Sequence, residues 1–245
     1  MPEKPTFALE DVDFEATYQG KPPVKGKETS FGVTPWDIGE PQPLVVELER
    51  SGQLKGEILD AGCGLGENAL FLAGKGHRVT GIDAAQTALD KARRLAEERD
   101  ASVEFVRSDA TTLTELDDER FTSVLDSTLY HCLTEDKQRD YAAALHRVTK
   151  PGAQLHLFCF ADTATGFRLP QFLVSRQNLR TNLGPHWDIH DIRPAQYTTS
   201  LTRETIVAMD ARFADIGISI NPDEVEVDEQ GRVQATVWHL HATRR

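Results

Sequence analysis

Short apolar runs alternate along the chain with longer stretches in which apolar residues return every three or four positions. The apolar runs cover residues 57–59, 77–82, 103–106, 121–125 and 155–160 and are predicted to be strands. The stretches between them have the spacing of helices with one buried face. This alternation, at about 20 to 25 residues per unit, predicts an α/β fold with a parallel sheet and helices on both faces.

The last third of the chain departs from this rhythm. In residues 161–197 the aromatic, arginine and histidine side chains follow no clear period, so we expect a long irregular connection that covers a ligand site. Thr202 is placed to cap a helix that runs to about Phe213. Residues 216–220 and 233–240 then read as two strands around an acidic turn, which predicts a terminal antiparallel pair.

The chain has 245 residues, which is the size of one large α/β domain with or without an insertion. Acidic residues outnumber basic ones by 39 to 27, and the net charge of -12 disfavours nucleic acid and anionic membranes as partners. The cysteines Cys63, Cys132 and Cys159 form no C-x-x-C pair, so neither a metal site nor a disulfide is expected. Without a visible signal peptide or a membrane-spanning apolar run, a cytoplasmic location is expected.

Residues 1 to about 35 differ from the rest because they are polar and rich in Pro, Gly and Lys. Isolated aromatic residues interrupt this segment: Phe7, Phe14, Tyr18 and Phe31. Such a segment is either a loose tail or a lid that its aromatic side chains pin over a ligand. We therefore divide the chain into an N-terminal lid or tail, residues 1–35, and a main domain, residues 36–245. The main domain is expected to carry a substrate-covering insertion at about 161–200.

A glycine turn follows the first predicted strand. Gly62, Gly64 and Gly66 lie between that strand and the next helical pattern, and Asp60 precedes them by two residues. A strand, a glycine turn and a helix N-terminus together form the nucleotide-binding corner of an α/β sheet. The spacing is not the dinucleotide fingerprint G-x-G-x-x-G, because Glu67 occupies the place of the third glycine. An NAD-dependent oxidoreductase is therefore the weaker alternative.

Asp83 ends the second predicted strand, 21 residues after Gly62, where a carboxylate can hold ribose hydroxyls. Together with the D-x-G-x-G-x-G turn, it resembles the first motifs of class I methyltransferases that use S-adenosylmethionine (SAM). The resemblance implies a Rossmann-like, doubly wound sheet of about seven strands with an antiparallel C-terminal hairpin. It also implies SAM as the cofactor, with a binding site formed by Asp60, Gly62, Gly64, Gly66, Asp83, Ala84, Asp109, Ala110 and Asp126.

Three further stretches narrow the resemblance: Tyr18-Gln19-Gly20, residues 35–43 beginning Pro35-Trp36-Asp37, and Asp126-Ser127-x-x-Tyr130-His131. They resemble the mycobacterial heterocyclic toxin methyltransferases and, more distantly, the thiopurine and the halide or thiol methyltransferases. The resemblance covers about residues 14–160 and the terminal hairpin. It implies a detoxifying O-methylation of a small heteroaromatic compound such as a hydroxyquinolone or flavonol, with Tyr18 and Trp36 covering the cofactor. Packing of Trp36 against the first helix, methylation of thiols, thiopurines or halide, and non-catalytic SAM binding stay open as alternatives.

Tyr130 and His131 follow the fourth predicted strand, where class I enzymes place groups near the reacting methyl. Both are catalytic candidates, since histidine titrates near neutrality and can take a proton from an acceptor hydroxyl. A structural role for His131 beneath the site is an equal alternative. Methyl transfer from a sulfonium needs no metal, and none is expected. The aromatic walls predicted for a small aromatic substrate are Phe31, Phe167, Phe172 and Trp187, and both a monomer and a homodimer are compatible with the sequence.

Overall fold

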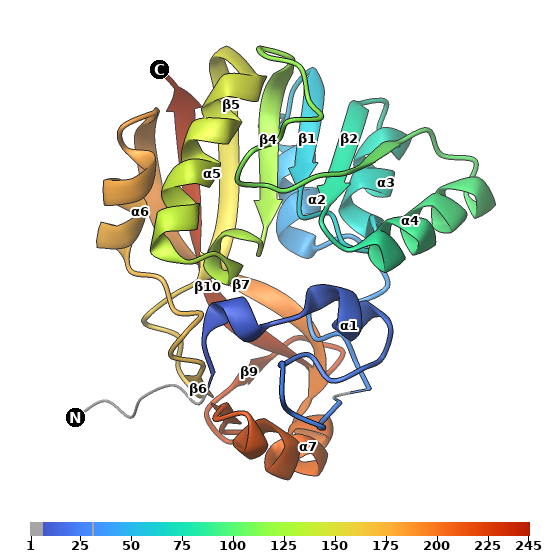
Figure 1. Cartoon of the computed structure of the whole chain (residues 1–245), viewed down its shortest axis with the longest axis vertical. Helices are drawn as coiled ribbons and strands as arrows, with labels where there is room; N and C mark the ends of the chain where they lie inside the picture. Colours follow the sequence, from blue (N-terminus) through green and yellow to red (C-terminus); the bar gives the residue numbers. More distant parts are fainter. Residues whose placement is uncertain (1–6, 31) are drawn as a thin grey trace.

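The computed structural model describes residues 7–30 and 32–245 of the chain. Its centre is one mixed sheet flanked by helices (Figure 1). The strands of this sheet are β1 (Glu57–Ala61), β2 (Arg78–Asp83), β3 (Glu104–Arg107), β4 (Phe121–Ser127), β5 (Thr149–Phe160), β7 (Trp187–Thr202), β9 (Glu226–Val227) and β10 (Arg232–Arg244). They lie in the order β3-β2-β1-β4-β5-β10-β7, and β9 pairs with β10.

The first five of these strands pair in parallel, whereas β10 pairs antiparallel with both β5 and β7. The predicted α/β fold with antiparallel C-terminal strands is therefore confirmed. Each predicted strand of the first 160 residues is present, with ends that differ by a few residues. Residues 123–127 of β4 are all buried, as expected of a strand with helices on both faces.

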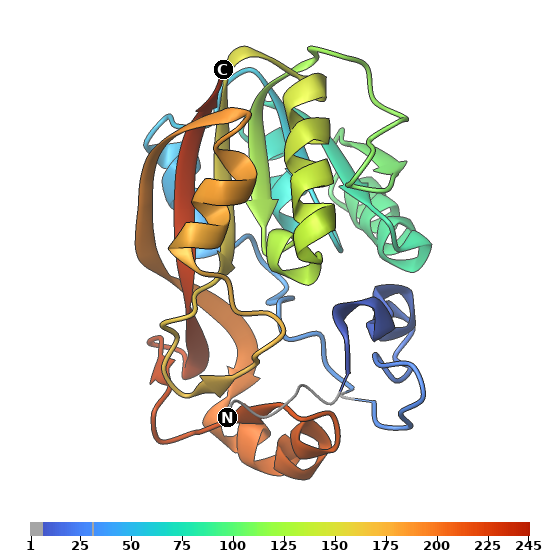
Figure 2. The same ribbon diagram turned by 60° about the vertical axis from the view of Figure 1, so that its left-hand side comes forward.

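Helices cover both faces of the sheet (Figures 1 and 2). On one face lie α2 (Pro43–Arg50), α3 (Glu67–Gly74) and α4 (Gln86–Glu98), and on the other lie α5 (Glu135–Val148) and α6 (Arg176–Leu183). The apolar spacing seen in the sequence explains this packing, because α4 buries Ala88, Leu89, Ala92 and Ala96 along one stripe. Two hydrophobic cores result, one under each layer of helices.

Pro151 and Gly152 follow α5 within a few residues. The helix ends at Val148, and both Pro151 and Gly152 belong to β5. The pairing of β4 with β5 is interrupted there, since Phe121 pairs with Thr149 and the next regular pair is two residues further along β4. Proline is tolerated in a strand at such an irregularity because no ladder hydrogen bond is required of its nitrogen.

The predicted irregular connection over residues 161–197 is also wrong in part, because it contains α6 and most of β7. Because β7 is the edge strand of the sheet, it carries exposed polar residues and Pro194. These residues hide the alternation of apolar and polar positions by which a strand is found in a sequence. The predicted strand 216–220 is reduced to β8 (Ser219–Ile220), which pairs with β6 (Phe167–Arg168) in a separate small sheet. The antiparallel partners of β10 are therefore β5, β7 and β9, and residues 216–220 are not among them.

The N-terminal segment and α7 (Arg203–Asp215) lie at the same end of the main sheet (Figures 1 and 2). The segment contains the short helices η1 (Leu9–Asp11) and α1 (Phe14–Tyr18). The predicted cap of α7 is confirmed, since the backbone N–H of Thr205 donates to the Thr202 hydroxyl at 3.2 Å. In the part of the chain that the structure describes, no helix has the length and apolar character needed to cross a membrane.

Candidate active site

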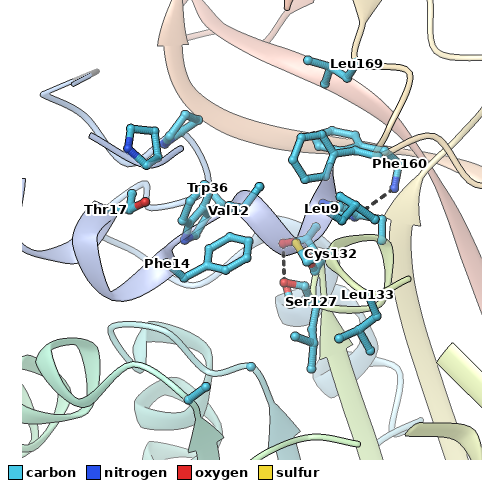
Figure 3. A pocket seen from close by; sticks show the side chains of 18 of the residues that line it. Leu9, Val12, Phe14, Thr17, Trp36, Ser127, Cys132, Leu133, Phe160 and Leu169 are labelled. Atoms are coloured by element: carbon cyan, nitrogen blue, oxygen red, sulfur yellow. Dashed lines mark hydrogen bonds between the residues drawn. The ribbon is translucent and has the colours of Figure 1, made fainter. Parts of the chain in front are cut away.

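A cavity of about 480 Å³ lies where the carboxyl ends of β2, β4, β5 and β7 meet the N-terminal segment. Leu9, Val12 and Phe14 of the N-terminal segment line the cavity together with Ser127, Cys132 and Leu133 (Figure 3). Phe160 at the end of β5 and Leu169 form a further part of the wall. The volume falls in the range of about 300–1,000 Å³ that is typical of small-molecule sites, and ligands of parallel sheets bind at this end.

The glycine turn borders the cavity through Gly62, while Gly64 and Gly66 shape the turn without lining it. Gly66 has a φ of +84° and precedes α3, and a Cβ there would lie 2.9 Å from the Phe105 ring. A Cβ on Gly64 would lie 2.7 Å from the Tyr18 hydroxyl. These two glycines are therefore required by positive φ and by close packing within the chain.

Asp83 and Ala84 line the cavity beside the glycine turn. The Asp83 carboxylate accepts the backbone N–H groups of Gly64 at 2.9 Å and of Ala85 at 2.8 Å, one on each oxygen. Burial raises its pKa from the ordinary value, and these hydrogen bonds oppose the rise. Each oxygen keeps a second lone pair, so the carboxylate is held in a fixed orientation and can still accept ligand hydroxyls.

Asp109 and Ala110 line the cavity after β3. One carboxylate oxygen of Asp109, Oδ1, accepts the backbone N–H of Thr111 at 2.9 Å and its hydroxyl at 2.7 Å. Among the described residues the other oxygen, Oδ2, has no hydrogen-bond donor. The structure thus brings Asp83, predicted to hold the ribose hydroxyls, and Asp109, predicted to belong to the same cofactor site, to one cavity.

Asp60 lies beneath the glycine turn, fully buried and outside the cavity wall. Within the described ranges neither of its carboxylate oxygens has a well-formed hydrogen bond. Burial, together with the nearby carboxylates of Asp126 and Asp83, raises its pKa to about 7. Like charges so close together in a buried region favour a cationic ligand. This negative potential therefore fits the sulfonium and ammonium charges of SAM.

Two predicted site residues, Asp126 near the end of β4 and Tyr130 in the turn after it, point away from the cavity. Asp126 accepts the backbone N–H of Leu129 at 2.8 Å and the hydroxyl of Tyr141 in α5 at 3.0 Å. The Tyr130 hydroxyl donates to the Asn178 side chain in α6 at 3.0 Å, and the ring is fully buried. The chain turns in the 3-10 helix η2 (Tyr130–Cys132), so successive side chains point in different directions. Neither Tyr130, predicted as a catalytic group, nor Asp126, predicted as a cofactor contact, lines the cavity.

His131 does line the cavity, and its ring is buried between aromatic side chains. Its ring centroid lies 4.6 Å from that of Phe160 and 5.9 Å from that of Phe172. The backbone N–H of Phe160 donates to His131 Nδ1 at 3.3 Å, which assigns the neutral tautomer with its proton on Nε2. Burial lowers the pKa of His131 to about 3. At neutral pH this side chain is a hydrogen-bond donor with little capacity to act as a base.

Tyr18 and Trp36 line the cavity next to the glycine turn. Trp36 Nε1 donates to the Tyr18 hydroxyl at 3.0 Å, and the two rings meet edge to face with centroids 6.2 Å apart. Helix α1 is held on α4, because the backbone N–H of Thr87 donates to the Glu15 carboxylate and Lys91 Nζ donates to the Tyr18 carbonyl at 2.6 Å. Trp36 thus both lines the cavity and packs against Tyr18 within the chain.

Phe167 and Phe172 line the cavity, as predicted for substrate walls, but Trp187 does not. Trp187 is fully buried beneath α5, and its Nε1 donates to the Ala142 carbonyl at 3.3 Å. The reason is direction: β7 runs parallel to β5, so its first residue lies at the end of the sheet opposite the cavity. Phe31, the fourth predicted wall residue, lies outside the described residues.

Sequence reasoning missed Tyr197, which lines the cavity from the later part of β7. The hydroxyls of Tyr197 and Ser127 lie 3.1 Å apart, and both residues border the same cavity. Burial raises the pKa of Tyr197 to about 12, so its hydroxyl is neutral. Ser127 belongs to the stretch 126–131 that the sequence singled out. Tyr197 is the last residue of the stretch 161–197, where no hydrophobic period marked it. Among the described residues no group of three or more His, Cys, Asp or Glu side chains is arranged to hold a metal ion.

Residues 58–152 match the protein family described as Methyltransferase domain. The 2-heptyl-1-hydroxyquinolin-4(1H)-one methyltransferase of Mycobacteroides abscessus is 36% identical over 197 residues, which are 78% of this chain and 82% of that protein. The probable thiol methyltransferase 2 of Arabidopsis thaliana is 27% identical over 135 residues, 55% of this chain and 60% of that protein.

One similar solved structure comes from work on the conversion of a disulfide bond into a thioacetal group during echinomycin biosynthesis. The match has a TM-score of 0.74 and 32% sequence identity, and it covers 94% of this chain and 90% of that one. The similarity therefore extends well beyond residues 58–152 and includes the elements that surround the cavity.

Proposed function

Since the chain belongs to the SAM-dependent methyltransferases, we propose that it methylates a hydroxyl group on a small heteroaromatic acceptor of the hydroxyquinolone or flavonol type. The protein is an enzyme, SAM is its cofactor, and its substrate is a small molecule. The observation that carries the proposal is the continuity of one cavity from Asp83 to Phe160 and Phe172. The relative from Mycobacteroides abscessus, named for a hydroxyquinolone, supports the same acceptor class.

SAM supplies an electrophilic methyl group on a sulfonium. We assign Asp83 to the ribose hydroxyls and Asp109 to the adenine amino group, since both carboxylates border the cavity with acceptor capacity to spare. Tyr18 and Trp36 cover this half of the cavity and exclude water. Asp60 lies beneath the turn, where the positive charge of bound SAM favours its ionised form.

The acceptor half of the cavity offers aromatic walls and lacks a strong base among its described side chains. Phe160, Phe172 and the neutral ring of His131 suit a flat aromatic compound through burial and ring contacts. A hydroxyl group on an electron-poor heterocycle is already partly ionised near neutral pH. The enzyme then needs to orient the acceptor oxygen toward the methyl group and to keep water out.

His131→Ala is expected to slow methyl transfer by less than the roughly 10²–10⁴-fold that an obligatory general base contributes. The pKa of about 3 also means that His131 should produce no step in kcat/KM between pH 6 and 8. Rates across that pH range, measured beside His131→Asn as the polar control, test this. A loss of several thousand-fold at unchanged substrate affinity would show that His131 is the base.

Tyr197→Phe is expected to lower kcat by roughly fivefold to twentyfold, with little change in KM for SAM. One hydroxyl of the Tyr197–Ser127 pair donates to the other, which leaves one hydroxyl hydrogen for the acceptor oxygen. The loss corresponds to one hydrogen bond, about 1–2 kcal/mol. Steady-state kinetics of Tyr197→Phe and Ser127→Ala, with the double variant, measure the coupling between them. Unchanged kcat in both single variants would remove the pair from the reaction.

A sulfur acceptor is the second candidate. Two of the similar proteins point to it: the probable thiol methyltransferase of Arabidopsis thaliana and the structure connected with a disulfide-to-thioacetal conversion. The lack of a strong base fits this acceptor too, because a thiolate attacks a methyl group without help.

The deciding experiment is a methylation screen with labelled SAM over hydroxyquinolones, flavonols, thiols, disulfides and halide. Transfer to the oxygen of a hydroxy-heteroaromatic compound, identified by mass spectrometry, is the expected result. Ready turnover of thiols or halide without any methylation of hydroxy-heteroaromatics would assign the protein to the sulfur or halide class. Calorimetry with SAM and S-adenosylhomocysteine serves as the parallel check that the protein is active in cofactor binding.

A further inference from the structure

The cavity continues past the aromatic walls into an apolar lobe. We define this lobe by six side chains: Leu169, Leu201, Phe213, Ile216, Ile218 and Ile220. They come from the turn after β6, from β7, from α7 and from the region of β8. Their exposed fractions lie between 1% and 9%, yet all six border the same cavity as Asp83 and His131. The lobe is thus sheltered from solvent and continuous with the reacting site.

The chemistry of the lobe is uniform, because none of its six side chains has a polar atom. Thr199, which borders the cavity from β7 near the lobe, donates its hydroxyl to the Val233 carbonyl at 2.8 Å and so has its own partner. A ligand group in the lobe therefore gains burial and dispersion contacts without finding a hydrogen-bond partner on these walls.

Such a space is costly for a folded protein unless a ligand uses it. Protein interiors are packed at the density of organic crystals, and an apolar void destabilises the fold in proportion to its volume. The small sheet of β6 and β8 supports the lobe: Phe167 pairs with Ile220, and the backbone N–H of Asn221 donates to the Gly166 carbonyl at 2.7 Å. This sheet lies apart from the main sheet, so it can hold the lobe open without contributing to either main core.

We propose that the lobe is a subsite for an unbranched aliphatic chain carried by the acceptor, an assignment that rests on the proposed function. The aromatic ring of the acceptor lies beside His131, Phe160 and Phe172, and the chain extends between α7 and the β6–β8 sheet. Five of the six lobe residues are leucine or isoleucine, whose branched side chains leave an irregular space that a flexible chain fills better than a second flat ring. The subsite makes chain length a determinant of specificity.

The test begins with the unaltered protein and 1-hydroxyquinolin-4(1H)-ones that carry a methyl, butyl or heptyl group at carbon 2. Dissociation constants are measured by calorimetry in the presence of S-adenosylhomocysteine. Each buried methylene is expected to tighten binding about fourfold until the lobe is filled. Equal affinity across the series would overturn the subsite.

Ile218→Trp fills the lobe and is expected to remove the chain-length dependence, so that the butyl and heptyl compounds bind no more tightly than the methyl compound. The matched control is Val207→Trp, which adds the same side chain to α7 at a position that is 64% exposed. If Ile218→Trp retains the full dependence, the chain binds elsewhere and the subsite is overturned. Should Ile218→Trp fail to fold, Leu169→Phe reduces the lobe from a different element and carries the same expectation.

Binding and turnover separate this inference from the function on which it rests. Chain-length-dependent binding that Ile218→Trp abolishes, without methyl transfer to any of the three compounds, would overturn the proposed O-methylation and keep the subsite. Methyl transfer to all three compounds at equal rates and affinities would overturn the subsite and keep the proposed O-methylation.

Discussion

Replacing Asp83 by alanine is expected to weaken SAM binding by roughly 10- to 150-fold, which corresponds to about 1.5–3 kcal/mol for a lost charge-assisted hydrogen bond. The carboxylate is oriented before a ligand arrives, because the N–H groups of Gly64 and Ala85 hold its two oxygens. Removing it loses the ribose contact and also a support of the glycine turn. Isothermal titration calorimetry with SAM measures the effect.

The matched control for Asp83→Ala is Asp90→Ala in α4, which removes the same charge from an exposed side chain paired with Arg93. This control is expected to bind SAM as the unaltered protein does. Asp83→Asn removes the charge but keeps the shape of the side chain and one acceptor oxygen. Its SAM affinity should therefore lie between those of Asp83→Ala and Asp90→Ala. Unchanged SAM affinity in a folded Asp83→Ala protein would remove Asp83 from the cofactor site.

Deleting residues 1–30 is expected to lower turnover on the order of 100-fold or more while the main sheet stays folded. The described part of this segment supplies Leu9, Val12, Phe14 and Tyr18 to the cavity wall and no strand to the main sheet. Without it, both halves of the cavity are open to water, and the acceptor loses the confinement that aligns it with the methyl group. Rates with saturating SAM, together with circular dichroism of the truncated protein, test this.

Lys21→Ala is the control in the same segment, because its side chain is exposed and donates only to the neighbouring Gln19 among the described residues. It is expected to leave turnover unchanged. Full activity of the truncated protein would show that the segment is a tail and not a lid. A smaller loss is expected from Lys27→Ala, which releases the ion pair with the Asp215 carboxylate of α7 at 3.6 Å and the hydrogen bond of Lys27 Nζ to the Asp215 carbonyl at 2.6 Å.

Much of the fold was predictable because its signals are local. Strands β1 to β5 are short apolar runs, and the buried stripe of α4 follows the helical period. The glycine turn was also predictable from the sequence, because the positive φ of Gly66 and the close packing at Gly64 both favour glycine. The acids after β2 and β3 were placed correctly at the cavity because carboxyl ends of parallel strands meet at one edge of the sheet.

Direction and long-range pairing were decided by the tertiary structure. Trp187 and Tyr197 belong to the same strand, yet only Tyr197 reaches the cavity, because β7 runs toward that end of the sheet. The edge position of β7 and the separate pairing of β6 with β8 have no local signature, since partners far apart in the chain define them. Sequence spacing alone therefore misassigned the terminal hairpin.

The chemistry of individual side chains depends on their environment in the same way. The sequence marked Asp126, Tyr130 and His131 as one cluster, but Asp126 accepts a hydrogen bond from α5, Tyr130 donates one to α6, and only His131 lines the cavity. Burial then lowers the pKa of His131 to about 3 and makes the predicted base a neutral donor. By itself the sequence determined the cofactor class, because backbone turns and strand ends bind SAM. The tertiary structure decided which side chains face the acceptor, because orientation and desolvation arise only when distant segments pack together.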